Sequence, residues 1–360
     1  MPHLRTRTPF NSALLRFRSE SIALVTQYFA ERGFTQTHPP IITSSDCEGA
    51  GEVFSVETAE ETPASDNGHD GSFFRSPKYL TVSSQLHLEA LAQSVGNVWT
   101  LSPTFRAEKS DTARHLSEFY MLEAEVGFVE EMDIIMDLVR DVLLHLTNNL
   151  KETRVGQEIL HGKRPGDQKG EAAKRSKELD QRWQDMVQGH WPRITYSKAM
   201  EILQAAPRGF KHAPKWGAGL QAEHERFIVS YVGEGTPVFV TNYPKDIKPF
   251  YMLPSKISDK HGETVECFDL LAPEVCEIVG GSMREHRLEP LLENMRANGM
   301  IGPGPDDLGN LKWYIDLRRW GTVPHGGFGL GFDRLLGYLS GVQNIRETVT
   351  FPRWYGRCDC

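Results

Sequence analysis

The sequence contains no apolar run that approaches the roughly 18 residues needed to cross a bilayer. It also lacks an excess of positive charge, because 40 Lys and Arg face 48 Asp and Glu and the formal net charge is -8. The first absence excludes membrane-spanning helices. The second excludes the wholly basic surface of a dedicated nucleic-acid-binding protein. A local cationic patch could still bind an anion or RNA.

Cysteine is sparse and the common nucleotide-binding motifs are missing. The five cysteines are unevenly spaced, which favours a reducing compartment over a disulfide framework, and the terminal CDC has too few ligands for a closed zinc site. The glycine-rich segment HGGFGLGF, residues 325–332, has neither the GxGxxG nor the GxxxxGK[ST] spacing. Glycine at alternate strand positions instead indicates close approach of another backbone or of a flat ligand.

The apolar pattern predicts helices beside hairpin-linked strands, and therefore an α+β fold with an antiparallel β-sheet flanked by helices. Helices are expected in 12–32, 132–150, 288–299 and after 332. Strands are expected in 98–108 and 118–128, which form an antiparallel hairpin, in 236–244 and 264–273, and in the glycine-rich segment. Residues 151–190, rich in Lys, Glu and Gln, are expected to form a helical, solvent-facing insertion.

The connection of that hairpin, TFRAEKSDTARHLSEF at residues 104–119, packs several cations between carboxylates. Most charge runs are solvated loops, and a single arginine is more often part of a surface ion pair. Together, however, Arg106, Arg114, His115 and Arg334 offer the forked donors that suit a polyphosphate.

Three further side chains can each be interpreted in two ways. Phe119 could stack on a base or belong to the core. Asp269 and Glu277 could hold Mg²⁺ through hard oxygens, or could be a pair of edge-strand acids.

These residues belong to a series of motifs that follow one another along the chain. FRAEKSDTARHLSEF resembles motif 2 of class II aminoacyl-tRNA synthetases, and GFGLGFDRL resembles their motif 3. SDCEGAGEVF, YLTVSSQL, HERFIV, DLLAPEVCEIVGGSMRE and NIRETVTFPR resemble asparaginyl-tRNA synthetases, with aspartyl-tRNA synthetases as close relatives. The resemblance covers about residues 4–353. It implies a catalytic domain over 1–360, which activates an amino acid with ATP and Mg²⁺ as aminoacyl-AMP and releases pyrophosphate.

The resemblance also implies roles on the nucleotide side. Arg106 would bind the α-phosphate of ATP, Glu108 the adenine edge or the amino-acid end, and Phe119 would stack beneath adenine. Arg114, His115 and Arg334 would hold the β- and γ-phosphates. Asp269 and Glu277 would carry Mg²⁺, so that Arg106, Arg334 and Glu277 form the catalytic set.

On the amino-acid side, the resemblance places Glu48 on a loop that closes over the substrate. Ser83 and Gln85 would face the α-amino group, and Arg284 would recognise the side-chain carbonyl or carboxylate of Asn or Asp. No side chain need act as a nucleophile, because orientation and electrostatics carry the reaction.

The sequence also departs from the family pattern. It begins close to the catalytic region, without the expected anticodon-binding OB-fold domain. The family usually has Gln at Met283, beside Arg284, so this chain lacks an amide that could orient the arginine, and the amino-acid specificity could differ. These departures favour a stand-alone paralogue that passes the adenylate to ammonia or a small amine. The alternatives are a genuine asparagine–tRNA ligase, truncated or organellar, that charges tRNA, and an inactive regulatory protein.

Assembly and location are expectations of the same kind. The first long helix and the HPPIIT segment resemble motif 1, so a homodimer is expected. The first nineteen residues hold four Arg and no acid, which resembles a mitochondrial transit segment. They are better read as part of the first helix of a cytoplasmic protein, with a mitochondrial location as the alternative.

Overall fold

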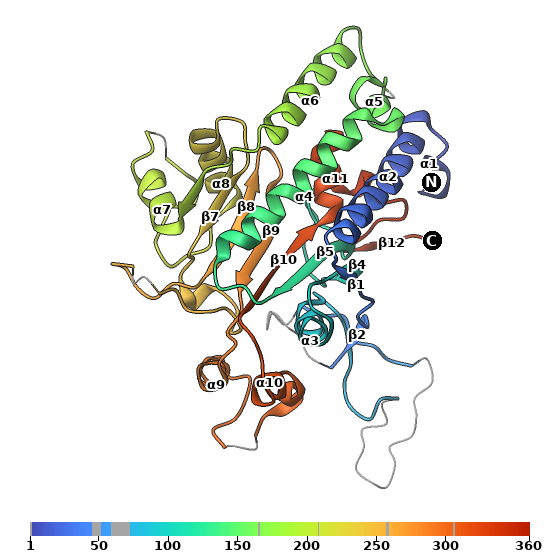
Figure 1. The fold of residues 1–360 in the computed structure, drawn as a ribbon. Helices are drawn as coiled ribbons and strands as arrows, with labels where there is room; N and C mark the ends of the chain where they lie inside the picture. Colours follow the sequence, from blue (N-terminus) through green and yellow to red (C-terminus); the bar gives the residue numbers. More distant parts are fainter. Residues whose placement is uncertain are drawn as a thin grey trace.

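A computed structural model describes residues 2–44, 52–58, 73–164, 166–207, 209–256, 259–304 and 307–360. Its centre is an eight-stranded sheet with the order β1-β4-β5-β10-β9-β8-β7-β6 (Figure 1). The pairs from β4 to β7 are antiparallel, and the two edge strands pair in parallel. The strands of this sheet are β1 (Thr35–Gln36), β4 (Val98–Phe105), β5 (Glu118–Gly127), β6 (Arg193–Thr195), β7 (Val238–Thr241), β8 (Cys267–Ala272), β9 (Cys276–Met283) and β10 (His325–Gly331).

Two small antiparallel pairs of strands lie outside the main sheet. They are β2 (Ile42–Thr43) with β3 (Tyr79–Leu80), and β11 (Arg353–Trp354) with β12 (Arg357–Cys358). The helices are α1 (Pro2–Arg5), α2 (Pro9–Glu31), α3 (Gln85–Val95), α4 (Met132–Glu152), α5 (Arg154–His161), α6 (Glu171–Val187), α7 (Tyr196–Gln204), α8 (Ala222–Ile228), α9 (Leu288–Ala297), α10 (Lys312–Arg319) and α11 (Phe332–Ser340).

One face of the sheet is buried beneath helices, with α4 and α2 lying across it in Figure 1. Alternate residues of β5, Leu122, Ala124 and Val126, join the hydrophobic core that α2, α4, α6 and α11 complete. Phe328 and Leu330 of β10 point into the same core. Since successive side chains of a strand point to opposite faces, the residues between them face the other side.

We call that other side the site face. There β5 contributes Glu123 and Glu125, which pair across the ladder with Gly329 and Gly327 of β10. A Cβ at Gly327 would lie 2.1 Å from Oε2 of Glu125 and 2.3 Å from the backbone oxygen of Ala124. Glycine is therefore required where a carboxylate crosses the neighbouring strand, which is the close approach that the alternating glycines predicted.

The sequence predictions of fold class and of the main elements are confirmed. The 98–108 and 118–128 segments form the β4–β5 hairpin, and the glycine-rich segment forms β10 followed by α11. The solvent-facing description of 151–190 is wrong for one side of α6. Leu179, Trp183 and Met186 are fully buried in the core, because apolar side chains at helical spacing recur between its charged residues.

Candidate functional site

A central hollow of about 540 Å³ lies on the site face, over β5, β10, β9 and β8. Its lining includes the predicted residues Ser83, Gln85, Arg106 and Arg284. It also includes side chains that the sequence analysis did not select: Glu123, Glu125, Lys248 and Tyr251. The sheet thus brings together residues from widely separated parts of the chain around one cavity.

Ser83 and Gln85 stand at the start of α3 and are held by buried acids. The Ser83 hydroxyl donates to Glu123 Oε1 at 2.5 Å, and the backbone N–H of Ser84 donates to Glu123 Oε2 at 2.9 Å. The Gln85 amide donates to Glu89 Oε1 at 3.1 Å. The hollow therefore has a negatively charged wall, well suited to an ammonium group.

Arg284 follows β9 and is almost completely buried. Its Nη2 lies 3.0 Å and its Nε 3.2 Å from the two carboxylate oxygens of Glu125, and its Nη1 donates to the Ser282 hydroxyl at 2.7 Å. Burial raises the pKa of Glu125, while Arg284 acts to lower it. A fixed donor and a fixed acceptor therefore stand side by side in the hollow.

A second buried acid, Glu89, acts electrostatically on this pair. Glu89 accepts from Arg318 Nη2 at 2.6 Å, from the Tyr314 hydroxyl at 2.8 Å and from His325 at 3.1 Å. Burial acts to raise the pKa of Glu89, but Arg318 and His325 outweigh it and hold that pKa below its usual value. The network fixes α3, α10 and β10 relative to one another.

An arginine hollow of about 170 Å³ adjoins the central hollow, with Arg106, Met121, Glu277 and Gly329 lining both. Its lining includes the predicted nucleotide-side residues Arg106, Glu108, Arg114, His115, Phe119 and Arg334. The structure therefore brings all six together, five from the connection 104–119 and Arg334 from the start of α11.

Local contacts orient these cations. The Arg334 guanidinium donates through Nη1 to the backbone oxygen of Glu277, and Arg114 Nη1 lies 3.2 Å from Cys276 Sγ. Arg106 lies 5.8 Å from the centre of the Phe119 ring. His115 Nε2 is 3.3 Å from Glu108. Burial lowers the pKa of His115, and Glu108 opposes that shift.

Asp269 and Glu277 meet above Gly280, where a Cβ would lie 3.5 Å from Oδ1 of Asp269 and 3.4 Å from Oε1 of Glu277. Burial raises the pKa of Glu277, and Asp269 raises it further. Lys248 Nζ lies 2.9 Å from Asp269 Oδ2. Two hard carboxylates that repel one another fit a divalent cation. No cluster of three or more metal-binding side chains occurs in the described residues, so substrate oxygens would complete the coordination.

A third acid, Glu225 of α8, lies beside this pair. Burial, followed by the charge of Glu277, raises the pKa of Glu225 to about 7. Because the folded state then keeps a proton that the unfolded chain loses near pH 4.5, the free energy of unfolding falls as the pH rises from about 4.5 to 7. The full cost is present above pH 7, and the Glu225→Gln variant removes it.

We therefore expect Glu225→Gln to be more stable than the wild type by about 2–3 kcal/mol at pH 8 and by little at pH 4.5. Urea unfolding in EDTA at the two pH values measures the difference. An equal difference at both values would show that Glu225 does not titrate in this range.

One predicted site residue is not described by the structure, and one interpretation of the sequence is wrong. Glu48 lies outside the described residues. The interpretation that Met283 acts on Arg284 is wrong, because Met283 is buried in the core on the opposite face, where a Cβ at Gly326 would meet its Sδ at 2.8 Å. Glu125 and Ser282 orient Arg284 instead.

Glu123 and Glu125 are residues that the sequence analysis missed. The signal is visible in EFYMLEAEVGF, where two acids alternate with residues that the core requires. An acid at a buried position of a strand indicates a partner or a ligand, because burying an unpaired carboxylate costs free energy of folding.

In the described ranges, none of the helices is both long enough and apolar enough to cross a membrane.

Comparisons with known proteins agree on one family. The family described as tRNA synthetases class II (D, K and N) matches residues 1–355. The mitochondrial asparagine–tRNA ligase of Saccharomyces cerevisiae is 44% identical over 362 residues, which cover 98% of this chain and 70% of that protein. The asparagine–tRNA ligase of Desulfotalea psychrophila is 43% identical, over 99% of this chain and 73% of that protein.

A solved structure gives the same result in three dimensions. Asparaginyl-tRNA synthetase of Pyrococcus horikoshii, complexed with asparaginyl-adenylate, superposes with a TM-score of 0.77 at 32% identity. The match covers 99% of this chain and 71% of that one.

Proposed function

Because the chain belongs to the class II tRNA synthetases and is therefore an ATP-dependent ligase, we propose that it activates asparagine as asparaginyl-AMP and transfers it to tRNA. The single observation that carries the choice of amino acid is the buried Glu125–Arg284 pair in the central hollow. The named asparagine–tRNA ligases that cover nearly all of the chain support the same choice.

The pair matches a carboxamide. A side-chain amide offers a carbonyl, which accepts from Arg284, and an NH₂ group, which donates to Glu125. Aspartate would place a second carboxylate against Glu125 in a buried site, and like charges at this range are strongly unfavourable. The hollow thus distinguishes asparagine from aspartate by charge as well as by shape.

The other end of asparagine would be fixed by the acid wall. Glu123 offers a negative charge to the α-ammonium, with Ser83 and Gln85 beside it. The α-carboxylate then faces the border between the two hollows, where Arg106 and Glu277 line both. This placement brings the attacking oxygen to the phosphate end of ATP.

For the first step, the asparagine carboxylate would attack the α-phosphorus of ATP. A carbonyl–O–phosphorus bond forms, the bond between the α-phosphorus and the bridging oxygen breaks, and pyrophosphate leaves with the electron pair. Arg106 would stabilise the charge at the α-phosphate, and Arg114, His115 and Arg334 would hold the leaving pyrophosphate. Asp269 and Glu277 would hold Mg²⁺, which neutralises phosphate charge when bound.

In the second step, a ribose hydroxyl of tRNA would attack the aminoacyl carbonyl. An ester forms, AMP leaves with the electron pair, and the hydroxyl proton passes to solvent. The sequence argument for a small-amine acceptor relied on the missing anticodon-binding domain and on an altered pocket, and one of its pocket changes, Met283, faces the opposite side of the sheet. Because the relatives that match nearly all of the chain are asparagine–tRNA ligases, we favour RNA as the acceptor.

The test is asparagine-dependent exchange of pyrophosphate into ATP, followed by measurement of acylated RNA. Asn and Asp are offered separately, with and without total tRNA, and with and without ammonium or a panel of small amines. Exchange with Asn and formation of Asn-tRNA support the proposal. Exchange with Asp alone would overturn the amino-acid assignment. A new amide formed without RNA would replace tRNA by a small amine.

We also propose that the chain is a homodimer. Leu15 of α2, and Ile41 and Ile42 further along the chain, are large aliphatic side chains that are 36%, 38% and 39% exposed in the isolated chain. They lie in the two segments that resemble motif 1, and burial against a second copy would remove their apolar surface from water. Sedimentation as a monomer at micromolar concentration would contradict this.

A further inference from the structure

The connection between β4 and β5 has an exposed tip, residues 111–113, which belongs to no helix or strand. Arg114 and His115 follow the tip directly and line the arginine hollow. An exposed loop samples many backbone conformations, and ordering it costs free energy. Two of the proposed phosphate ligands therefore depend on the contacts that hold the tip in place.

A turn near the end of the chain binds all three residues of the tip. It is the 3₁₀ turn η4 (Ile345–Glu347), which follows α11. The first N–H group of η4 donates to the backbone oxygen of Ala113 at 2.9 Å. Arg346 Nη2 donates to the backbone oxygen of Thr112 at 3.0 Å and to Asp111 Oδ1 at 2.7 Å. The tip is thus bound through its backbone as well as through a side chain.

Thr112 connects this turn to the two cations. Its backbone oxygen, which binds Arg346, also accepts from the N–H of His115 at 3.2 Å. Its hydroxyl lies 2.5 Å from Nδ1 of the His115 ring and accepts from the backbone N–H of Arg114 at 3.3 Å. Because Arg346 fixes the position of Thr112, it indirectly fixes the direction of the His115 ring.

Arg346 is itself held on several sides. Its side chain is 14% exposed, and its guanidinium carbon lies 4.2 Å from the centre of the Trp354 ring. Its backbone N–H donates to Asn344 Oδ1 at 3.1 Å, and its backbone oxygen accepts from Arg5 of α1 at 2.7 Å. A guanidinium held in this way loses little side-chain entropy when it binds the tip.

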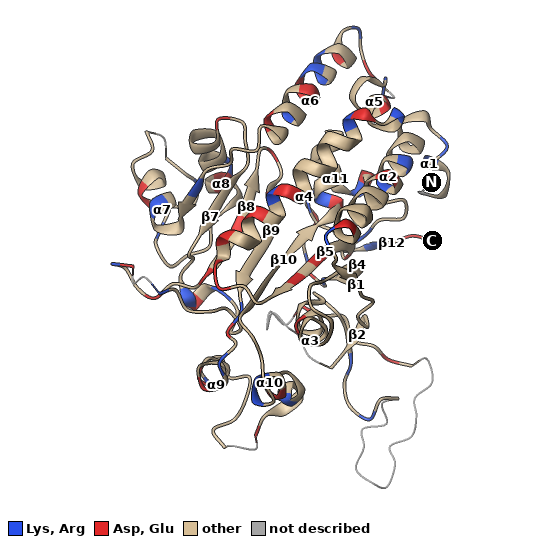
Figure 2. Cartoon of the chain, in the orientation of Figure 1, with Lys and Arg blue, Asp and Glu red and all other residues tan. Residues whose placement is uncertain are grey.

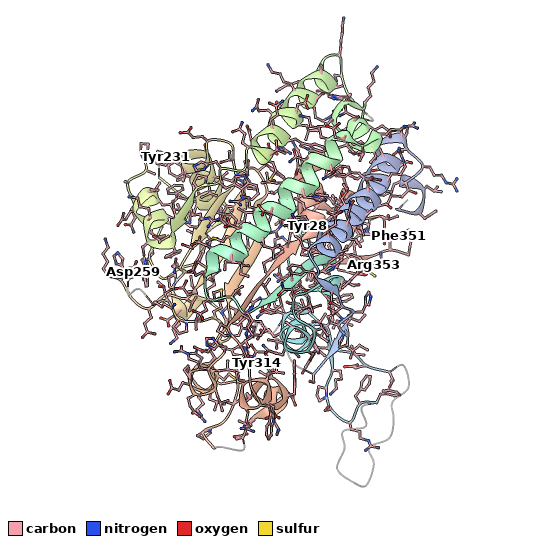
Figure 3. The ribbon with its side chains drawn as sticks, in the orientation of Figure 1. Tyr28, Tyr231, Asp259, Tyr314, Phe351 and Arg353 are labelled. Carbon is pink, nitrogen blue, oxygen red and sulfur yellow. The ribbon has the colours of Figure 1, made fainter. Side chains whose placement is uncertain are left out.

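The end of the chain holds the connection at a second point. The N–H of Ser117 donates to the backbone oxygen of Arg353 at 2.7 Å. Arg353 and Phe351 are labelled in Figure 3, on the side of the molecule where β12 and the C-terminus lie in Figure 1. Figure 2 shows blue segments both at α1 and at β12. The segment that binds the tip therefore joins both ends of the chain to the border of the arginine hollow, which Ile345 lines.

We propose that Arg346 is a positioning residue for the pyrophosphate end of ATP. It binds Asp111 and Thr112, and thereby keeps the two cations that follow them in the arginine hollow before the nucleotide arrives. In the described part of the chain, Arg346 lines neither the arginine hollow nor the central hollow, so it acts through Thr112 and not on ATP directly. The proposal rests on the proposed function, because it deepens the assignment of the arginine hollow to ATP.

The experiment measures pyrophosphate exchange by Arg346→Met, which keeps the apolar stem over Trp354 and loses the donors. The KM values for ATP and for pyrophosphate should each rise by about 10-fold, since charge-assisted hydrogen bonds to the tip are lost. The KM for asparagine should stay within about twofold of the wild type, because the central hollow is unchanged. The kcat at saturating ATP should fall by much less than the KM rises, since bound ATP itself orders the tip.

Two variants control this measurement. Arg346→Lys keeps a charge and a donor, and its KM for ATP should lie between those of the wild type and Arg346→Met. Arg357→Met removes an arginine that lies 5.1 Å from the same Trp354 ring but pairs with Asp359, so its KM for ATP should equal that of the wild type. A loss of kcat in Arg346→Met with an unchanged KM for ATP would make Arg346 merely structural and overturn the proposal.

A double-mutant cycle tests whether Arg346 acts through Thr112. Thr112→Val removes the hydroxyl beside His115 at an exposed position, and should also raise the KM for ATP. The rise in the double variant should be smaller than the product of the two single effects, because both substitutions release the same ring. A rise equal to that product would overturn the proposal.

A further variant covers the case in which Arg346→Met does not fold. Asp111 is 67% exposed, so Asp111→Asn breaks the same ion pair without disturbing the core. It should raise the KM for ATP by about threefold and leave the KM for asparagine unchanged. An unchanged KM for ATP in Asp111→Asn and in Thr112→Val would then contradict the proposal.

The proposed function and this proposal fail in different ways. If the wild type shows no asparagine-dependent pyrophosphate exchange, the proposed function fails and this proposal fails with it. If the wild type is active and Arg334→Ala is not, but Arg346→Met has the KM for ATP of the wild type, only the role of Arg346 is wrongly assigned.

Discussion

Arg334→Ala should lower the rate of asparagine-dependent adenylate formation by about 100-fold or more, equivalent to about 3 kcal/mol of transition-state stabilisation. The reason is that Arg334 lines the arginine hollow together with Arg106 and is held there by the backbone oxygen of Glu277. It would act on charge that develops as pyrophosphate leaves. Pyrophosphate exchange at saturating asparagine measures the loss in kcat, and Arg106→Ala should show a loss of the same order.

Two comparisons make this result interpretable. Arg334→Lys keeps one positive charge but loses the planar fork, so its activity should lie between those of the wild type and Arg334→Ala. Arg319→Ala removes an arginine that is 39% exposed and paired only at the surface, and its exchange activity should equal that of the wild type. Adenylate formation that survives both Arg106→Ala and Arg334→Ala would refute the assignment of the arginine hollow to ATP.

Arg284→Met should have the largest effect on stability, lowering the free energy of unfolding by about 3–5 kcal/mol at pH 7. Arg284 and Glu125 are 4% and 1% exposed, so the substitution leaves a buried carboxylate without its counter-charge. Loss of the arginine raises the pKa of Glu125 further, since burial already raises it. The loss of stability should therefore become smaller as the pH falls and Glu125 takes up a proton.

Urea unfolding of four proteins tests this explanation. The Arg284→Met and Glu125→Gln double variant should be more stable than Arg284→Met alone, because it removes the uncompensated charge. Arg319→Met, which breaks an exposed pair with Asp316, should change the free energy of unfolding by less than about 1 kcal/mol. If Arg284→Met were no more destabilising than Arg319→Met, the buried pair would not be charged in the folded protein.

Much of the fold could be predicted from local pattern. The β4–β5 hairpin and the strand-to-helix passage at β10 and α11 follow from runs of strand length, from glycine spacing and from the apolar period. The parallel edge pairing of β1 with β4 and of β6 with β7 has no local signal, because it joins segments distant in sequence. The buried side of α6 was missed because Leu179, Trp183 and Met186 are outnumbered by charged residues on the same helix.

The candidate site also contains residues that the sequence identified and residues that it missed. The cations of 104–119 and Arg334 stood out because they are concentrated in motifs, and the structure gathers them in one hollow, although their roles stay a prediction. Glu89 was missed because its partners Arg318 and His325 come from other elements. Met283 was wrongly expected to affect Arg284 because the two residues are adjacent in sequence. Adjacent side chains on a strand point to opposite faces of the sheet, so this adjacency is evidence against a shared pocket.

The position of β10 has a consequence for how the protein is made. β10 is the last strand of the main sheet in chain order, yet it lies in the middle, between β5 and β9. While the ribosome is still producing the chain, both of those strands keep an unpaired edge, and the carboxylates of β5 have no glycine ladder beside them. Such edges are where nascent chains associate wrongly. We expect this protein to need shielding by chaperones until its final segments emerge, and to become active only after synthesis is complete.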